Sequence, residues 1–142
     1  MGIGISSSVS YTPGIATQNP SIPQSSPVSA PANQYSDVTS ITLTAGSWLL
    51  SASVGVIANS YITPISVTCG FATTSGAMAT GLIIGVNASQ GAPAATGCDS
   101  VISVPASIYT VSSNTVIYLK VNCTATSGTG QAYGSIIALK TG

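Results

Sequence analysis

The sequence predicts an all-β protein, an antiparallel jelly roll or β-sandwich of about seven or eight strands, and three observations point there. From Val38 onward, apolar residues recur with a period of two, and Val, Ile, Thr, Tyr and Ser dominate, as suits a pleated sheet. The alternating segments are short and are separated by turns rich in Gly, Ser, Asn and Pro. No segment between them shows a helical period, and this spacing indicates a sandwich.

The first two strands are predicted at residues 38–43 and 48–57, joined by a Thr-Ala-Gly-Ser turn. In the second strand, alternate residues from Trp48 to Val56 share one face. Because Trp48 is the only tryptophan and opens this face, we expect it to anchor the core.

The middle of the chain predicts two further strands and a long loop. Val67, Cys69 and Phe71 alternate in one strand, and residues 78–86 form the next. Residues 87–97 are rich in Gly, Ala and Pro and predict a loop, an element that often carries recognition.

Strands resume at residues 101–104 and 108–111, before a final pair. Residues 115–124 show the cleanest alternation, which predicts a central strand with two apolar or hydroxyl-bearing faces. The second face is therefore expected to meet another subunit. Residues 131–139 close the domain with one face made of Tyr133, Ser135, Ile137 and Leu139.

Residues 1–36 differ from the β domain predicted at residues 37–142. A proline recurs every few residues, which forbids a helix and interrupts ladder pairing. Such a segment is either a disordered tail or an extended arm that docks on neighbouring subunits. Apolar side chains favour the docking arm, and they are the candidate interface residues: Ile3, Ile5, Val9, Tyr11, Ile15, Ile22 and Val28.

The shortage of charge excludes several partners. Charged residues make up 3% of the 142 residues, the formal net charge is +0, and there is no histidine. Two lysines cannot form the basic stripe that nucleic acid requires, nor the polybasic cluster that an anionic membrane attracts. No apolar run reaches the roughly 20 residues of a spanning helix. We expect a chain this poor in charge to be packed against neighbours.

Catalysis, metal binding and cofactor binding are not expected. Without an imidazole there is no Ser-His-Asp or Cys-His arrangement. Lys120 and Lys140 are interpreted as solvated or snorkelling lysines, and Asp37 and Asp99 as carboxylates that cap backbone N–H groups in turns.

The three cysteines, Cys69, Cys98 and Cys123, have neither an even count nor a CxxC spacing. They predict buried free thiols that pack as small apolar side chains.

Two segments resemble a known family. Residues 41–54 (ITLTAGSWLLSASV) resemble the strand-turn-strand of phage structural jelly rolls. Residues 116–121 (VIYLKV), with 132–140 (AYGSIIALK), are similar to the final hairpin of those domains, found in virion decoration proteins and fibre tips. The resemblance implies a tailed-phage decoration or cement protein that sits outside the capsid and ties coat subunits together.

Two functions follow as hypotheses. In the first, the chain is a structural virion protein, made in the host cytoplasm and bound to the capsid exterior. Its partners are the major capsid protein and further copies of itself, as a dimer or trimer. In the alternative, it is a receptor-binding or fibre-tip module whose loops, especially residues 87–97, bind a glycan or protein of the host cell surface.

Overall fold

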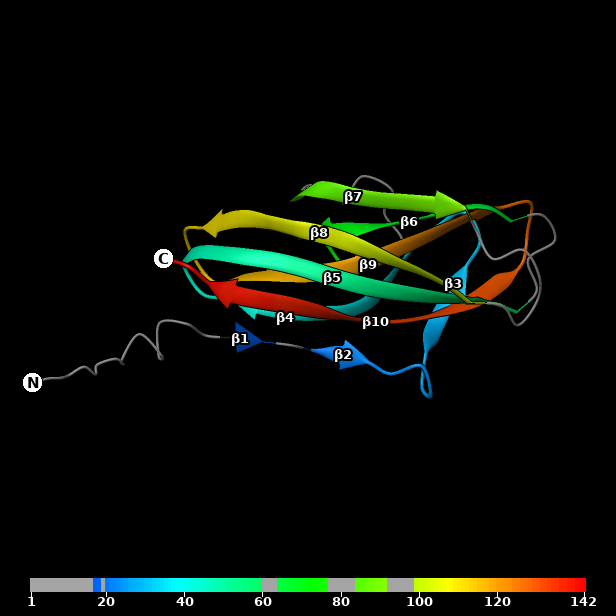
Figure 1. Cartoon of the computed structure of the whole chain (residues 1–142), viewed down its shortest axis with the longest axis horizontal. Helices are drawn as coiled ribbons and strands as arrows, with labels where there is room; N and C mark the ends of the chain where they lie inside the picture. The colour runs from blue at the N-terminus through cyan, green and yellow to red at the C-terminus, as the bar shows by residue number, and fades with distance from the viewer. Residues whose placement is uncertain (1–16, 19, 60–63, 77–83, 92–98) are drawn as a thin grey trace, which may run out of the picture.

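A computed structural model describes residues 17–18, 20–59, 64–76, 84–91 and 99–142 (Figure 1). Within these ranges the chain forms strands and turns and no helix, and therefore no helix that could span a membrane. The strands are β1 (Thr17–Gln18), β2 (Ser21–Ile22), β3 (Val28–Pro31), β4 (Tyr35–Leu43), β5 (Gly46–Ala58), β6 (Pro64–Ala72), β7 (Ile84–Gly91), β8 (Asp99–Val111), β9 (Thr115–Ala125) and β10 (Thr129–Lys140).

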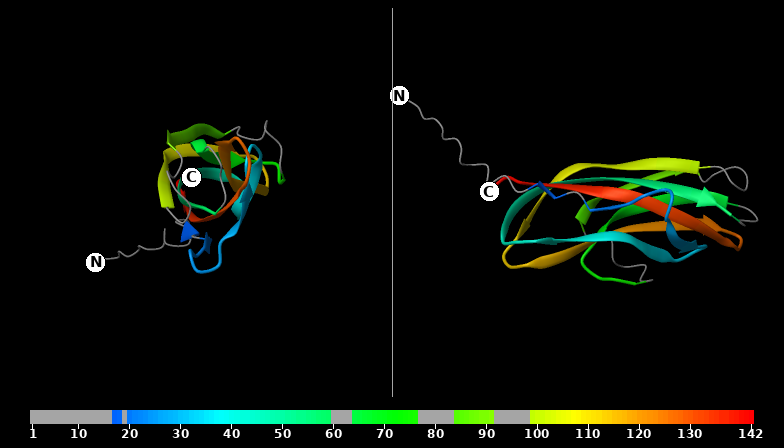
Figure 2. Two further views of the ribbon diagram at one scale, coloured as in Figure 1. Left: turned by 90° about the vertical axis from the view of Figure 1, so that its right-hand side faces the viewer. Right: turned by 90° about the horizontal axis from the view of Figure 1, so that it is seen from below.

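The strands form two antiparallel sheets that face each other (Figure 2). One sheet has the order β10-β5-β8, with β1, β2 and β3 all paired to the other edge of β10. The second sheet has the order β4-β9-β6-β7. Leaving aside the two-residue strands β1 and β2, eight strands build the sandwich, and the chain changes sheet at most connections, as in a jelly roll. The predicted fold class is confirmed.

The N-terminal segment runs along β10 as one interrupted strand (Figure 1). Its pairs with β10 include Thr17 with Leu139, Ser21 with Ser135, and Ala30 with Gly130. Prolines punctuate the segment and cannot donate to the ladder, but their carbonyls still accept. The Pro20 carbonyl accepts a hydrogen bond from the N–H of Ile136 at 3.1 Å.

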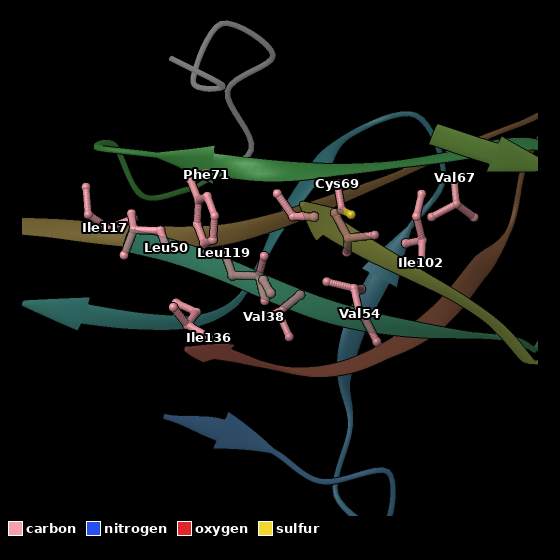
Figure 3. Packing of buried hydrophobic residues seen from close by; sticks show 14 of the residues in the cluster. Val38, Leu50, Val54, Val67, Cys69, Phe71, Ile102, Ile117, Leu119 and Ile136 are labelled. Carbon is pink, nitrogen blue, oxygen red and sulfur yellow. The ribbon is translucent and has the colours of Figure 1, made fainter. Parts of the chain in front are cut away.

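The core lies between the sheets and is filled by the inward residues of both (Figure 3). Trp48 is 1% exposed, which confirms its predicted place, and its indole Nε1 donates to the carbonyl of Thr44 at 2.8 Å. Ile117, Leu119 and Val121 are fully buried, and β9 lies between β4 and β6, as predicted for a central strand. Each such side chain contributes about 1.5–3 kcal/mol by its removal from water.

Asn33 fixes the corner between β3 and β4. Its φ of 63° lies in the left-handed region, which Asn tolerates better than most residues. Its side chain imitates a backbone pair, because Nδ2 donates to the Ala125 carbonyl at 2.6 Å and Oδ1 accepts from the Ala125 N–H at 3.1 Å. The end of β9 is thereby joined to the N-terminal segment.

Two strand predictions are wrong. Residues 87–91, predicted as part of a loop, belong to β7, where Ala88, Ser89 and Gln90 pair with β6. Their polar composition hid the strand, because an edge ladder needs only backbone groups. Residues 101–104 and 108–111 are not separate strands but one strand, β8, with a bulge opposite Ser51. Pro105 is tolerated there because β8 ends the sheet order, where one side of the strand needs no ladder donor.

Candidate functional site

No described side chain on the outer surface of the β10–β5–β8 sheet is charged, and we name this surface the uncharged face. Asp99, whose side chain lies outside those described, takes the outward register position beside Ile57 at the end of β8. Register and burial show that alternate residues point outward. The face consists of Gln131, Tyr133, Ser135, Ile137 and Leu139 of β10, Ser47, Leu49, Ser51, Ser53, Gly55 and Ile57 of β5, and Val101, Ser103, Ile108 and Thr110 of β8.

Large apolar side chains gather on the uncharged face. Among the described residues, four large hydrophobic side chains are exposed, and three of them lie here: Val101 at 54%, Ile108 at 59% and Ile137 at 48%. Single exposed apolar residues are ordinary, but three on the same side of one sheet, two on β8 and one on β10, make that side a candidate interaction surface.

The residues of this face form rows across the strands. Ile108, Leu49 and Leu139 are register partners in one apolar row. Ser103, Ser53 and Ser135 form a serine row.

A second apolar row joins Val101, Gly55 and Tyr133. The Tyr133 ring covers Gly55 so closely that a Cβ built there would lie 2.1 Å from the ring Cζ. An aromatic ring over a strand glycine shields the glycine backbone from water and fills the missing side-chain volume.

The outer surface of the opposite sheet is organised by an ion pair. Lys120 lies on β9, and its register partners are Asp37 on β4 and Gly70 on β6. The Lys120 Nζ donates to Asp37 Oδ1 at 2.5 Å and to the Gly76 carbonyl at 2.6 Å. The lysine side chain is 0% exposed, whereas that of Asp37 is 26% exposed.

The same carboxylate holds the loop that follows β6. Asp37 Oδ2 accepts from the Ser75 hydroxyl at 2.6 Å and from the Gly76 N–H at 3.0 Å. Gly76 has a φ of +93°, a left-handed conformation that glycine adopts without strain. Ser75 and Gly76 are thus tied to the face of the sheet by both members of the pair.

These contacts set the charge state of Asp37. Partial burial raises its pKa, but hydrogen bonds from Lys120, Ser75 and the Gly76 N–H, with the charge of Lys120, outweigh that effect. The pKa of Asp37 is therefore lower than its ordinary value of 3.8.

Lys120 is the residue whose predicted role the structure corrects. It is not a solvated or snorkelling lysine, because it is buried among Asp37 and the Gly76 carbonyl. The prediction that Asp37 caps a backbone N–H is confirmed at Gly76. Asp99 opens β8 in the other sheet, and its side chain lies outside those described.

Lys140 lies at the end of the sandwich rather than on either outer face. Its Nζ is 5.7 Å from the centre of the Trp48 ring and 3.3 Å from the Thr44 hydroxyl. A cation above an aromatic face is a favourable contact. The stem is half-buried, which agrees with the expected snorkelling lysine.

The described residues offer no further chemical site. No pocket opens among them, and they contain no cluster of three or more His, Cys, Asp or Glu side chains. Cys69 and Cys123 are buried free thiols, as predicted, and Cys98 lies outside the described residues. Of the loop predicted to carry recognition, residues 92–97 lie outside them too.

The predicted interface residues divide into two groups. Ile22 and Val28 are partly buried against the core of their own sandwich. The remaining five lie outside the described residues: Ile3, Ile5, Val9, Tyr11 and Ile15.

The interface residues predicted from the sequence include no residue of the uncharged face. The alternation of Tyr133, Ser135, Ile137 and Leu139 in the sequence indicates one strand face of this surface. Alternation alone, however, does not tell which side of a strand faces water.

Comparisons with known proteins concern the fold. No protein-family model and no curated protein sequence matches the chain. Among solved structures, it is similar to VP2 of infectious bursal disease virus in a subviral particle, with a TM-score of 0.53, 13% identity and 100% of the chain covered. A structure of the Gt strain of the same virus matches with a TM-score of 0.52, 13% identity and 99% coverage. The chain spans 38% and 36% of those two proteins, and at this identity the likeness is one of fold.

Proposed function

We propose that this chain is a structural protein of a virion, a decoration or cement subunit that binds the outside of the capsid. In this role it contacts the major capsid protein and stabilises the contacts between neighbouring coat subunits. Residues 1–16 act as a strap that docks on the shell, and the sandwich lies over the junction between coat proteins.

The observation that carries the proposal is the way the few charges are placed. Asp37 and Lys120 neutralise each other beneath a loop, and Lys140 lies over Trp48. The described side chains on the large outer face of the β10–β5–β8 sheet carry hydroxyl, amide and apolar groups. Burying charged groups costs several kcal/mol for each ion, whereas hydroxyl groups can be covered cheaply where their hydrogen bonds are met. Such a surface suits a subunit that is covered by neighbouring proteins in an assembly.

The fold comparison supports the same role. The chain matches, along its whole length, part of a VP2 protein whose structure was solved in a subviral particle. A jelly roll hosts many functions, so this likeness adds support and does not carry the proposal alone.

The strap is tested by a truncation that leaves the sandwich intact. Removing residues 1–16 keeps every described contact, including the pairing of β1, β2 and β3 with β10. The full chain and the truncated chain are added to purified shells of the virus that encodes it, prepared without this gene. Bound copies are counted after gradient sedimentation, and shell melting temperatures are measured.

We expect the full chain to bind at a fixed number of copies and to raise the melting temperature of the shell. The truncated chain should stay unbound while keeping the circular dichroism of the full chain. Equal binding by both would remove the strap from the proposal. Failure of the full chain to bind, together with its absence from native particles, would remove the structural role itself.

A further inference from the structure

We infer that the uncharged face is a self-association surface, covered by the same face of a second copy of this chain. This goes beyond the proposed function, because self-association through this sheet is independent of whether the dimer then binds a shell. Three features of the face support it: its charge, its symmetry and its size.

Charge permits the pairing. Two identical surfaces repel if either carries net charge at its centre, because each charge meets its own copy across a two-fold axis. The described side chains of the uncharged face bear none, and the outward position of Asp99, beside Ile57, lies at the end of β8 and away from the centre of the face. The other large exposed hydrophobic side chain, Val116, lies on the opposite sheet, where Ser75 and Gly76 already cover part of the surface.

The order of the rows is nearly the same in both directions along β5. An apolar row at Gly55 is followed by serine at Ser53, serine at Ser51 and an apolar row at Leu49. A two-fold axis that lies between the copies and crosses the strands between Ser51 and Ser53 sets the Gly55 row of one copy against the Leu49 row of the other. On β5 it sets Ser53 against Ser51, and on β10 it sets Ser135 against Ile137. Few unrelated partners would share that order, which favours a second copy as the occupant.

In this arrangement the apolar side chains meet across the axis. The row of Val101 and Tyr133 in one copy faces the row of Ile108 and Leu139 in the other. Ile137, which is 48% exposed, stands beside Ser51 and fills the space next to the axis.

The face also has the right size. Strands of 12 to 13 residues at about 3.3 Å per residue, spaced about 4.8 Å apart, give three strands a flat area of roughly 600 Å². Accessible surface exceeds its flat projection, so this approaches the roughly 800 Å² per partner of a standard specific interface.

The first experiment measures the mass of the purified full chain by sedimentation velocity. We expect a dimer, at twice the 13.9 kDa of one chain. The variant Ile108→Lys/Ile137→Lys places like charges on both sides of the axis and should weaken the dimer by about 100-fold or more, to a folded monomer. Val116→Lys adds the same charge to the opposite sheet and should remain dimeric.

A second variant locates the axis without perturbing the apolar rows. Ser51→Cys, in a Cys98→Ser background, should be joined to its copy in the dimer by a short bis-maleimide, because facing sheets lie about 10 Å apart, too far for a direct disulfide. Cys69 and Cys123 are buried and should not react. A single cysteine at Val116 in the same background should stay uncross-linked.

Three results would overturn the inference. They are a monomeric or trimeric wild type, a dissociation constant unchanged in the double lysine variant, and a dimer in which the bis-maleimide does not join the two copies of the cysteine at position 51. Circular dichroism and thermal unfolding of each variant show that a change in mass is not a loss of fold.

Discussion

At the scale of single residues, Asp37 and Lys120 hold unequal positions in one ion pair. Lys120 has no exposed surface, whereas Asp37 keeps 26% of its side chain in water and also accepts from Ser75 and Gly76. Loss of the carboxylate leaves a buried ammonium with the Gly76 carbonyl, while loss of the ammonium leaves a carboxylate that still has water and two donors. The two losses should therefore differ in cost.

Asp37→Asn is expected to lower the free energy of unfolding by about 4 kcal/mol and Lys120→Met by about 2 kcal/mol. The double variant should be more stable than Asp37→Asn alone, since it removes the stranded charge. Chemical denaturation measures all three, with Lys140→Met as a control expected to cost less than about 1 kcal/mol. Equal costs for the two single variants would contradict the asymmetry.

The same pair predicts how stability depends on pH. Because the pKa of Asp37 is lower in the folded chain than its ordinary 3.8, its ionised form stabilises the fold above that pH. The stabilisation is lost as the pH falls through the folded-state pKa.

Thermal unfolding should accordingly give a melting temperature that is flat from about pH 5 to 8 and falls below about pH 4. In Asp37→Asn the acid fall should be shallower, although the melting temperature is lower throughout. An unchanged acid slope in that variant would show that Asp37 does not provide the stabilisation.

At the scale of elements, the N-terminal segment from Pro20 to Asn33 belongs to the sandwich that it borders. Ala30 is 1% exposed, and Asn33 joins the segment to Ala125. Removal of residues 1–16 therefore leaves this part of the sandwich in place, whereas removal of residues 1–36 deletes it. Both truncations delete the candidate strap.

We expect removal of residues 1–16 to leave the free energy of unfolding within about 0.5 kcal/mol of the full chain. Removal of residues 1–36 should cost about 3 kcal/mol or more, through lost burial at Ala30 and loss of the Asn33 hydrogen bonds. Chemical denaturation of both truncations compares them directly. Equal stability of the two would mean that β3 adds nothing to the sandwich.

The strand pattern of the sequence predicted the class of fold because burial follows local alternation. Ile117, Leu119 and Val121 point inward as their spacing indicates. The misplaced element boundaries, at residues 87–91 and at Pro105, lie in β7 and β8, where backbone pairing overrides side-chain preference.

The site was harder to predict because its parts are distant in sequence. Asp37 and Lys120 are separated by 83 positions, and only the register of β4 against β9 brings them together. Likewise, Leu49 and Ile108 become neighbours only when β5 pairs with β8. The composition shows that charged residues are few, but it does not show on which surface of the fold described charged side chains are absent.

At the scale of the whole molecule, the chain has two acidic and two basic residues, and the pairing of Asp37 with Lys120 keeps most of two of these charges from water. The ion pair is covered by a loop on one sheet, Lys140 lies at the end, and the described side chains on the other sheet form serine and apolar rows. Such a molecule has little electrostatic protection against association, which favours its incorporation into an assembly. The assembly that we propose is a virion.

Imaging of purified particles by electron cryomicroscopy, with and without this gene, tests that claim most directly. We expect sandwich-sized density on the outer surface of the shell, at the junctions between coat subunits, which disappears when the gene is deleted. Identical particles from both preparations, with the protein recovered only as a free monomer, would contradict it.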